Sequence, residues 1–362
     1  MSKSFVHLHA HTEYSMLDGA AKINDYLKKV KELNQPAAAI TDHGNLYGAL
    51  EFVRQAEILD IKPIIGYEAY VTPGSRFDRP ERDKNKRYHL TLLAENNIGY
   101  QNLVELVSKA YLEGFYYKPR VDYDLLKEHA EGIIALSGCL GGEVAQHLAP
   151  DGSREEGNTA NEKSYEKALE KAKNYQNIFG QENFFIELHN HGINQQIQIL
   201  DDLVNISKEI DAPLVAANDS HYVSKNDSSA HDALLCVQTN ATMEDDDRFK
   251  FDGEEYYVKS SEEMRQLFPD ELFPNACDNT LKIADRVNYQ FSFDKDYLPD
   301  FPIDDSSLTV EEFLRKKVFI GAEQKYSGIE QPKIFNESIF SLSEKVSDEI
   351  VVIKSNSVNE DS

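Results

Sequence analysis

The sequence has few cysteines and no long apolar run. Its three cysteines, Cys139, Cys236 and Cys277, lie far apart and form no Cys-x-x-Cys pair. An odd number of isolated cysteines argues against a disulfide framework or a zinc ribbon and favours a reducing compartment. No apolar run approaches the roughly 20 residues of a membrane span, and no signal-peptide stretch precedes the strand-like segment that starts at residue 4. We therefore expect a cytoplasmic protein without a membrane partner.

Basic residues are scarce as well. The 362 residues include 38 Lys and Arg against 63 Asp and Glu, a formal net charge of −25. A protein that wraps duplex DNA on its own needs a broad basic surface, so this balance argues against that class. The charge balance does not exclude a small pocket that binds phosphate groups through metal ions. Hydrophobic residues make up 41% of the chain, enough for a substantial core in two or three domains, or in one large α/β barrel with an appendage.

Strand-like runs alternate with helical patterns over the first 221 residues. Seven runs are typical of strands, at residues 4–12, 37–43, 62–71, 88–94, 132–139, 183–191 and 213–221. Helical patterns fall between them, at residues 20–34, 45–60, 101–113, 162–179 and 195–210. The alternation predicts right-handed crossovers and a parallel sheet, closed or nearly closed into a β/α barrel. An open doubly wound sheet is the alternative, although no Gly-x-Gly-x-x-Gly turn follows any strand to support dinucleotide binding.

The pattern becomes mainly helical after residue 221. Helices are predicted at residues 227–237, 261–268, 275–287 and 309–326. From residue 329 the chain is rich in Ser, Glu and Asn and has no strong period, which is typical of a poorly ordered terminus or of the edge of a longer protein. We expect a barrel domain over residues 1–285, a helical linker over 286–328 and a poorly ordered tail over 329–362.

Histidines concentrate in the predicted strands. Eight of the eleven lie in the seven runs: His7, His9, His11, His43, His89, His189, His191 and His221. Side chains at i, i+2 and i+4 of a strand share a face, so the first three point one way. Imidazoles that face a barrel interior are costly unless satisfied, and metal coordination removes that cost. The same spacing pairs Asp219 with His221 on the last run.

Further candidates fall at the ends of other strands, where barrel active sites lie. Asp42-His43-Gly44 ends the second run, Glu68 lies in the third and Cys139 ends the fifth, whereas His89 lies at the start of its run. Nitrogen, carboxylate and thiolate ligands together favour zinc or manganese over magnesium. So many ligands imply more than one ion, and clustered metals suit phosphate-ester hydrolysis.

Several of these residues have structural alternatives. Cys139 can be a buried core thiol, Glu68 a surface acid, and Asp18 a turn residue before a helix. The loop at residues 76–87 carries six basic residues and is either a solvated loop or a guide for a phosphate backbone. The aromatic run at residues 115–120 either stacks bases or packs a loop against its own barrel.

The order of the motifs carries a family resemblance. Phe-Val-His-Leu-His-Ala-His at residues 5–11 continues to Asp18 and Gly19, and further motifs follow at residues 40–45, 62–70, 136–139, 217–222 and 231–239. From about residue 4 to about residue 326 the chain closely resembles the start of the α subunit of bacterial DNA polymerase III. The resemblance implies a PHP domain, a distorted seven-stranded, TIM-like β/α barrel with a trinuclear site for zinc and/or manganese, followed by a short, mostly helical extension.

The resemblance also implies roles for individual residues. Nine positions match metal ligands of relatives with an intact site: His9, His11, Asp18, His43, Glu68, His89, Cys139, Asp219 and His221. Five of them are expected to act in catalysis through the metals, namely His9, His11, His43, Asp219 and His221. His7 and His191 then either support the ligands from behind or face the substrate. His189 stays unassigned, and no organic cofactor is expected.

The activity implied by the resemblance belongs to DNA replication. We expect a metal-dependent hydrolase, a 3′→5′ exonuclease that proofreads a DNA 3′ end. The complete α subunit is a DNA-directed DNA polymerase, a nucleotidyltransferase whose palm lies beyond this chain, so the chain alone is not expected to polymerise DNA. Other α-subunit domains and replisome subunits are the expected partners. A metal-stabilised scaffold without catalysis and a free-standing phosphatase of a small phosphomonoester are the alternatives.

Overall fold

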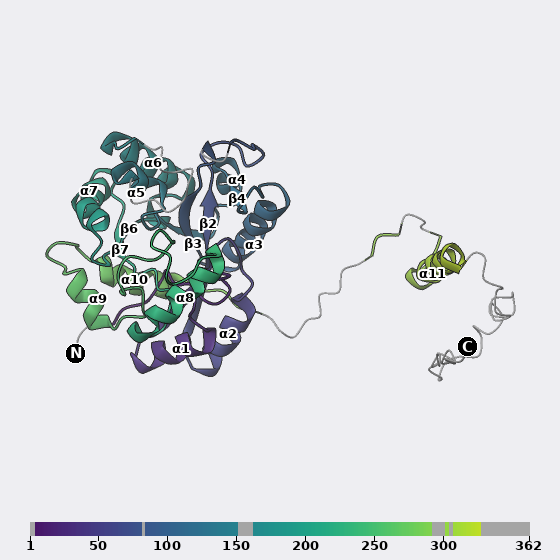
Figure 1. Ribbon diagram of the computed structural model, residues 1–362. Helices are drawn as coiled ribbons and strands as arrows, with labels where there is room; N and C mark the ends of the chain where they lie inside the picture. Colours follow the sequence, from purple (N-terminus) through teal and green to yellow (C-terminus); the bar gives the residue numbers. More distant parts are fainter. Residues whose placement is uncertain (1–3, 82–83, 151–161, 292–300, 304–306, 327–362) are drawn as a thin grey trace. The chain divides into compact units, whose positions relative to one another are not determined.

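A computed structural model describes residues 4–81, 84–150, 162–291, 301–303 and 307–326 (Figure 1). The chain divides into two units, residues 1–291 and 292–362. The first unit holds the sheet and ten of the helices described below. In the second unit, helix α11 spans Val310–Tyr326. The predicted tail at residues 329–362 lies outside the described residues.

The first unit is built on one curled, mixed sheet of seven strands. Their bounds are Ala37–Ile40 for β1, Lys62–Val71 for β2, Tyr88–Ala94 for β3, Arg120–Val121 for β4, Ile133–Leu136 for β5, Phe184–Leu188 for β6 and Leu214–Ala216 for β7. The strands follow the order β1-β2-β3-β5-β6-β7, and β4 pairs with β2. This α/β half-barrel confirms the predicted fold class.

The expectation of an all-parallel sheet is wrong at β3. This strand runs antiparallel to both β2 and β5, whereas the other paired strands are parallel. Parallel neighbours need a long crossover, usually a helix, but antiparallel neighbours need only a turn or loop. Residues 72–87 join β2 to β3, and their described part contains no α-helix. The chain therefore returns beside β2 in the opposite direction.

The predicted strand at residues 4–12 is also irregular. It makes isolated bridges, His7 with Ala38 on one side and Ala10 with Ser220 on the other. Side-chain oxygens accept hydrogen bonds from two of its backbone amides. Thr41 Oγ1 accepts from Ala10 N at 2.8 Å, and Asp42 Oδ1 accepts from Thr12 N at 2.6 Å. At these two amides, side-chain acceptors take the place of the backbone carbonyls of a neighbouring strand. The segment thus links the β1 side of the sheet to the chain that follows β7.

Helices surround the sheet. Their bounds are Ile23–Glu32 for α1, Ala49–Ile58 for α2, Asn97–Leu112 for α3, Tyr123–Glu128 for α4, Glu143–Leu148 for α5, Tyr165–Phe179 for α6, Asn194–Ile210 for α7, Ser228–Thr239 for α8, Ser261–Leu267 for α9 and Ala276–Arg286 for α10. Short 3₁₀ helices lie at Gln181–Asn183 and Lys225–Asp227. The helical patterns of the sequence match these helices within a few residues, but α4 and α5 were not predicted.

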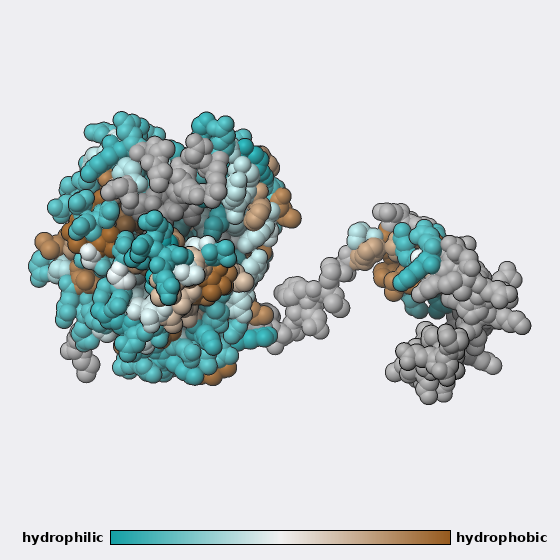
Figure 2. Space-filling model, in the orientation of Figure 1, coloured by the Kyte–Doolittle hydropathy of each residue, from teal (hydrophilic) through white to brown (hydrophobic). Residues whose placement is uncertain are grey.

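The core lies between the helices and the sheet. Helix α1, for example, buries Ile23, Tyr26, Leu27 and Val30, the i, i+3, i+4, i+7 spacing of an amphipathic helix. Each such large apolar side chain contributes about 1.5–3 kcal/mol when it is fully buried. The face shown in Figure 2 is mainly hydrophilic, with apolar residues in small separate areas. Within the described part of the chain, no helix has the length and apolar character that crossing a membrane requires.

Candidate metal centre

The nine predicted ligands converge at one end of the curled sheet; we call them the ligand cluster. Most of them follow or end strands, as the sequence pattern predicted. They come from the amino-terminal segment (His9, His11), the turn before α1 (Asp18), the end of β1 (His43), β2 (Glu68), the start of β3 (His89), the loop after β5 (Cys139) and the chain after β7 (Asp219, His221).

The direction of β3 explains the position of His89. Because β3 runs antiparallel to β2, its first residues lie beside the last residues of β2, and His89 pairs with Tyr70. The amino end of β3 therefore meets the carboxyl ends of the parallel strands. In this position His89 Nδ1 is 2.9 Å from Glu68 Oε1.

Glu68 lies in the middle of the ligand cluster. Its Oε2 is 2.7 Å from His43 Nδ1 and 3.4 Å from His11 Nε2, and its Oε1 is 3.4 Å from His9 Nε2. The carboxylate is 1% exposed, so the surface-acid alternative is wrong. Burial raises the pKa of Glu68, but the surrounding imidazoles, led by His89 and His43, bring it well below its ordinary value. The carboxylate is therefore ionised and ready for a cation.

Two aspartates complete the acidic part of the cluster. Asp219 Oδ1 is 3.1 Å from His11 Nε2 and 3.4 Å from His9 Nε2. Asp18 Oδ2 is 2.8 Å from His43 Nε2 and 3.8 Å from His221 Nε2. Asp18 thus occupies a turn, as one reading of the sequence has it, and its carboxylate still faces the cluster.

Cys139 is at the edge of the same cluster. Its Sγ is 3.7 Å from Glu68 Oε1 and 3.7 Å from His89 Nδ1, and it accepts a hydrogen bond from Gly141 N at 3.4 Å. Burial, followed by the charge of Glu68, raises the pKa of the thiol. Asp42, by contrast, accepts hydrogen bonds from Thr12 N and from Ser15 Oγ, so its carboxylate fixes the turn beside the cluster.

The donor atoms of the cluster fit divalent metal ions. Buried atoms without a hydrogen-bond partner among the described residues include Nε2 of His9, His11 and His221 and Oδ1 of Asp18 and Asp219. Such atoms are costly inside a protein unless something else binds them. Four sets of three donors, in each of which the donor atoms lie within 4.8 Å of one another, overlap among the described residues: His11–His43–His221, His9–His11–Asp219, His43–Glu68–His89 and His9–Glu187–His189. Imidazole and carboxylate donors at this density suit divalent cations.

Glu187 in β6 was not predicted from the sequence. Its side chain is fully buried, and His9 Nδ1 donates to its Oε1 at 2.7 Å. Gly138 N donates to Oε2 at 2.9 Å, and His189 Nε2 is 3.0 Å from Oε1. Burial raises the pKa of Glu187, but His9 and His189 outweigh it, so the pKa is about 2. This carboxylate fixes the His9 ring with Nε2 toward the cluster. The i, i+2 spacing of Glu187 and His189 was the available signal.

The other predicted histidines lie behind the cluster or away from it. His191 Nε2 donates to the carbonyl of Asn218 at 2.8 Å, and its ring stacks on Tyr256 with centroids 4.0 Å apart. His7 Nε2 donates to the carbonyl of Lys259 at 2.9 Å. Burial lowers the pKa of His191 to about 3 and that of His7 to about 4. Both rings are therefore neutral hydrogen-bonding groups.

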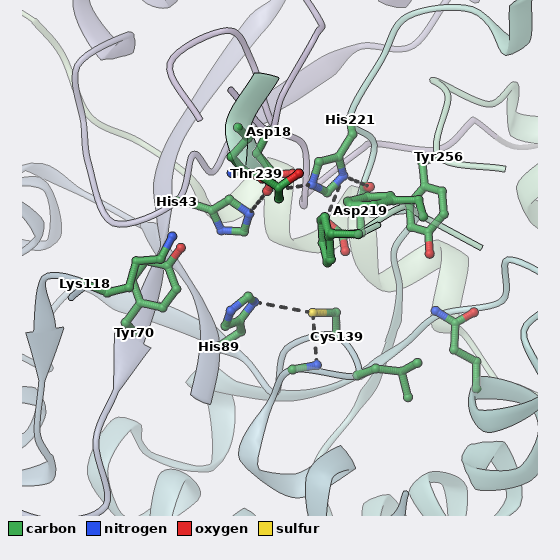
Figure 3. A pocket seen from close by; sticks show the side chains of 16 residues that line it. Asp18, His43, Tyr70, His89, Lys118, Cys139, Asp219, His221, Thr239 and Tyr256 are labelled. Carbon is green, nitrogen blue, oxygen red and sulfur yellow. Dashed lines mark hydrogen bonds and ion pairs between the residues drawn. The ribbon is translucent and has the colours of Figure 1, made fainter. Parts of the chain in front are cut away.

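A cavity of about 390 Å³ opens onto the cluster. Figure 3 shows Tyr70 and Lys118 on one side of it and Tyr256 on the opposite side, with His43, His89 and Asp219 between them. Lys118 Nζ lies 5.1 Å from the centre of the Tyr70 ring. Among the described residues that line the cavity, Lys118 is the only lysine or arginine. A ligand of modest size thus has access to the cluster.

The sequence is similar to those of proteins named DNA polymerase III subunit alpha. It is 44% identical over 338 residues to the DNA polymerase III subunit alpha of Thermus aquaticus, a match that covers 89% of this chain and 26% of the relative. It is 41% identical over 341 residues to the subunit of the same name from Borreliella burgdorferi, covering 94% of this chain and 28% of that protein. The chain thus spans about a quarter of the length of these curated relatives.

Solved structures give more distant matches. A two-domain protein from Bacteroides vulgatus, described as containing a predicted PHP-like metal-dependent phosphoesterase, is 12% identical with a TM-score of 0.38; the match covers 78% of this chain and 69% of that one. An amidohydrolase from Chromobacterium violaceum is 15% identical with a TM-score of 0.34, covering 60% and 88%. The family model of the PHP domain matches residues 7–191, half of the chain. The chain belongs to the PHP-domain family.

Proposed function

We propose that this chain is the amino-terminal PHP region of a replicative DNA polymerase III α subunit and acts as a metal-dependent phosphodiesterase, a 3′→5′ exonuclease on DNA. The observation that carries the proposal is the convergence of nine buried or half-buried ligand side chains beneath an open cavity. The similarity to two proteins named DNA polymerase III subunit alpha supports the polymerase part of the proposal. The DNA 3′ end, the remaining α-subunit domains and other replisome subunits are the proposed partners, in the cytoplasm.

The proposed cofactor is a cluster of three divalent ions, zinc and/or manganese. The number three follows from the family resemblance. The overlapping donor sets support the binding of divalent cations, and the mixture of imidazoles, carboxylates and one thiol supports these metals. The nine residues of the ligand cluster would hold the ions. Bound ions of this kind supply Lewis acidity and a nucleophile at neutral pH for phosphate-ester hydrolysis.

The chain's own residues prepare the site for that chemistry. Ionised Glu68 and Asp219 provide the negative charge that the cations need, and Glu187 orients His9. The protein therefore pays the cost of ordering the ligands during folding, before substrate arrives. Aromatic side chains on the cavity walls, among them Tyr70 and Tyr256, restrict water around the reacting phosphate.

The same proposal assigns the domains of the chain. Residues 1–285 would form the PHP domain and residues 286–328 a helical linker toward further domains, followed by the divergent segment 329–362. Polymerase activity would belong to the longer protein, so we do not expect the purified chain to add nucleotides to a primer.

The decisive experiment is cleavage of a 5′-labelled single-stranded DNA oligonucleotide at low salt with manganese or zinc. We expect products that shorten from the 3′ end, and a loss of at least about a hundredfold in rate for His9→Ala or after chelation, because the ligands supply several kcal/mol of transition-state stabilisation through the metals. His129→Ala is the matched control, since His129 contacts Asn102 and Lys109 away from the cluster, and it should cleave normally.

Two other outcomes would favour the alternatives. Binding of more than one metal ion per chain without cleavage of any substrate would support a metal-stabilised scaffold. Hydrolysis of p-nitrophenyl phosphate that is much faster than oligonucleotide cleavage would support a phosphatase of small monoesters.

A further inference from the structure

Exposed aromatic side chains lie close to the cavity. Tyr47, Tyr111 and Phe115 are 58%, 36% and 51% exposed. The ring centroids of Tyr47 and Tyr111 are 6.4 Å apart, and those of Tyr111 and Phe115 are 6.1 Å apart. We call these three residues the aromatic row. Large aromatic rings are usually packed away from water, so a continuous exposed row indicates a binding surface.

The aromatic row continues into the wall of the cavity. Tyr70 and Lys118 line the cavity, and Phe115 lies three residues before Lys118 in the chain. Tyr47 lies three residues after Gly44. At Gly44 the segment that leads to Tyr47 meets Tyr70 and Pro119. Gly44 has a φ of +65°, and a Cβ there would lie 2.8 Å from Pro119 Cγ and 3.3 Å from Tyr70 Cε2. The loop that carries Tyr47 therefore packs tightly against the loop that carries Lys118.

A buried arginine holds that second loop in place. Arg120 is fully buried. Its Nε donates to the carbonyl of Gly114 at 3.0 Å, and its terminal nitrogens donate to the carbonyls of Arg76 and Asp78 at 2.9 and 2.7 Å and to Asn85 Oδ1 at 3.0 Å. These bonds fix the loop and the neighbouring basic loop as one unit. The exposed rings are thus presented from a rigid base, which lowers the entropy cost of binding.

Tyr117 gives independent support from backbone conformation. It has a φ of 63°, an unfavourable value for a bulky residue, and its ring is 55% exposed. The surrounding turn is closed by a hydrogen bond from Tyr116 N to Lys118 O at 3.0 Å. Strained residues persist where the rest of the structure maintains them, and they concentrate at binding sites. This strained turn places Lys118 in the cavity wall.

We propose that the aromatic row and Lys118 bind the single-stranded end of a nucleic acid, with bases stacked on the rings and a backbone phosphate beside the Lys118 ammonium. This inference rests on the proposed function, and it identifies the surface that would hold the single strand beside the cavity. Stacking requires bases whose faces are free, which a single strand offers and an intact duplex does not. Stacking also suits a chain with a net charge of −25, because it provides affinity without a broad basic surface.

The test measures binding without cleavage. The full chain, kept metal-free with chelator at low salt, is titrated into 5′-fluorescein-labelled (dT)12 while fluorescence anisotropy is recorded. We expect Tyr47→Ala and Phe115→Ala each to weaken binding about fivefold or more, since one stacked base is lost. Phe115→Tyr keeps the ring and should keep the affinity. Lys118→Gln should reduce the slope of log affinity against log salt by about one unit.

Leu112→Ala is the matched control for the aromatic variants. Leu112 is the last residue of α3, the helix that carries Tyr111, and is 85% exposed, so this change removes apolar surface without removing a ring. It should bind (dT)12 as the unchanged chain does, and thermal unfolding should show that all variants are folded.

Three results would overturn the inference. One is unchanged affinity in Tyr47→Ala and Phe115→Ala; another is binding of a duplex of the same length as tightly as (dT)12. The third is a chain that binds no oligonucleotide and forms a dimer that Phe115→Ala dissociates, which would identify the row as a self-association surface. Because binding is measured without metal, absence of cleavage in the earlier experiment would refute the proposed function alone.

Discussion

Glu187 is a carboxylate with no exposed surface, and its contacts all go to groups around the ligand cluster. Its Oε1 accepts a hydrogen bond from His9 Nδ1 at 2.7 Å, and its Oε2 accepts one from Gly138 N. A buried charge of this kind is costly unless it is paired and hydrogen-bonded. The pattern of its contacts indicates that it fixes the orientation of the His9 imidazole, which we propose as a metal ligand.

We predict that Glu187→Gln weakens metal binding about 10- to 100-fold while the chain stays folded, because the amide keeps the shape of the side chain and loses its charge. Competition with a chromogenic chelator measures the affinity. Glu182→Gln makes the same chemical change at an exposed position two residues before β6 begins and should leave the affinity unchanged. Equal affinities in the two variants would refute the role of Glu187.

At the scale of elements, β2 and β3 approach each other closely beneath the cluster. Gly66 is two residues before Glu68 and pairs with Leu93. A Cβ at Gly66 would lie 2.2 Å from the carbonyl oxygen of Leu92 and 2.7 Å from Leu93 Cδ2. Only glycine fits at this point without separation of the two strands.

We therefore predict that Gly66→Ala lowers the free energy of unfolding by about 1–3 kcal/mol, the usual cost of overpacking. Urea unfolding followed by circular dichroism measures the change. Gly74→Ala is the comparison, because a Cβ there meets only the side-chain oxygen of Asp78, at 3.3 Å. A Gly66→Ala chain as stable as Gly74→Ala would show that β2 and β3 adjust without cost.

The sequence reveals the spacing of the histidines, but it does not reveal the direction of β3. The i, i+2 pairs are visible because side chains alternate along any extended segment. The antiparallel return of β3 was not visible, since the sequence of a strand does not state which way its neighbour runs. The sequence pattern alone puts His89 at the start of its run, away from the other candidates, whereas in the structure it lies beside Tyr70 and contacts Glu68.

At the scale of the whole molecule, the ligand cluster joins parts of the chain that are far apart in sequence. Asp18, His89 and His221 come from widely separated parts of the first unit, which ends at residue 291. A ligand that binds only the folded state stabilises it by mass action. Metal ions bound here would thus resist separation of the amino-terminal segment, β3 and the chain after β7.

Removal of metal is therefore predicted to lower the Tm of the chain. At an ion concentration about 100 times the Kd the stabilisation is about 2.7 kcal/mol, which corresponds to about 5 °C or more for a unit of this size. Differential scanning calorimetry with chelator and with increasing manganese or zinc measures the shift. His9→Ala should reduce it, and His129→Ala should keep it. Identical Tm values with chelator and with metal would contradict the prediction.

The sequence by itself determined the α/β alternation, most helix positions and the concentration of histidines on strands, because periodicity and composition are local properties. The resemblance to a known family, rather than spacing, supplied the full set of nine ligands. Tertiary structure alone decided the reversal of β3, the irregular segment at residues 4–12 and the pairing of Glu187 with His9. Each of these depends on contacts between residues distant in sequence, and the free energy of such contacts is set only when the chain folds.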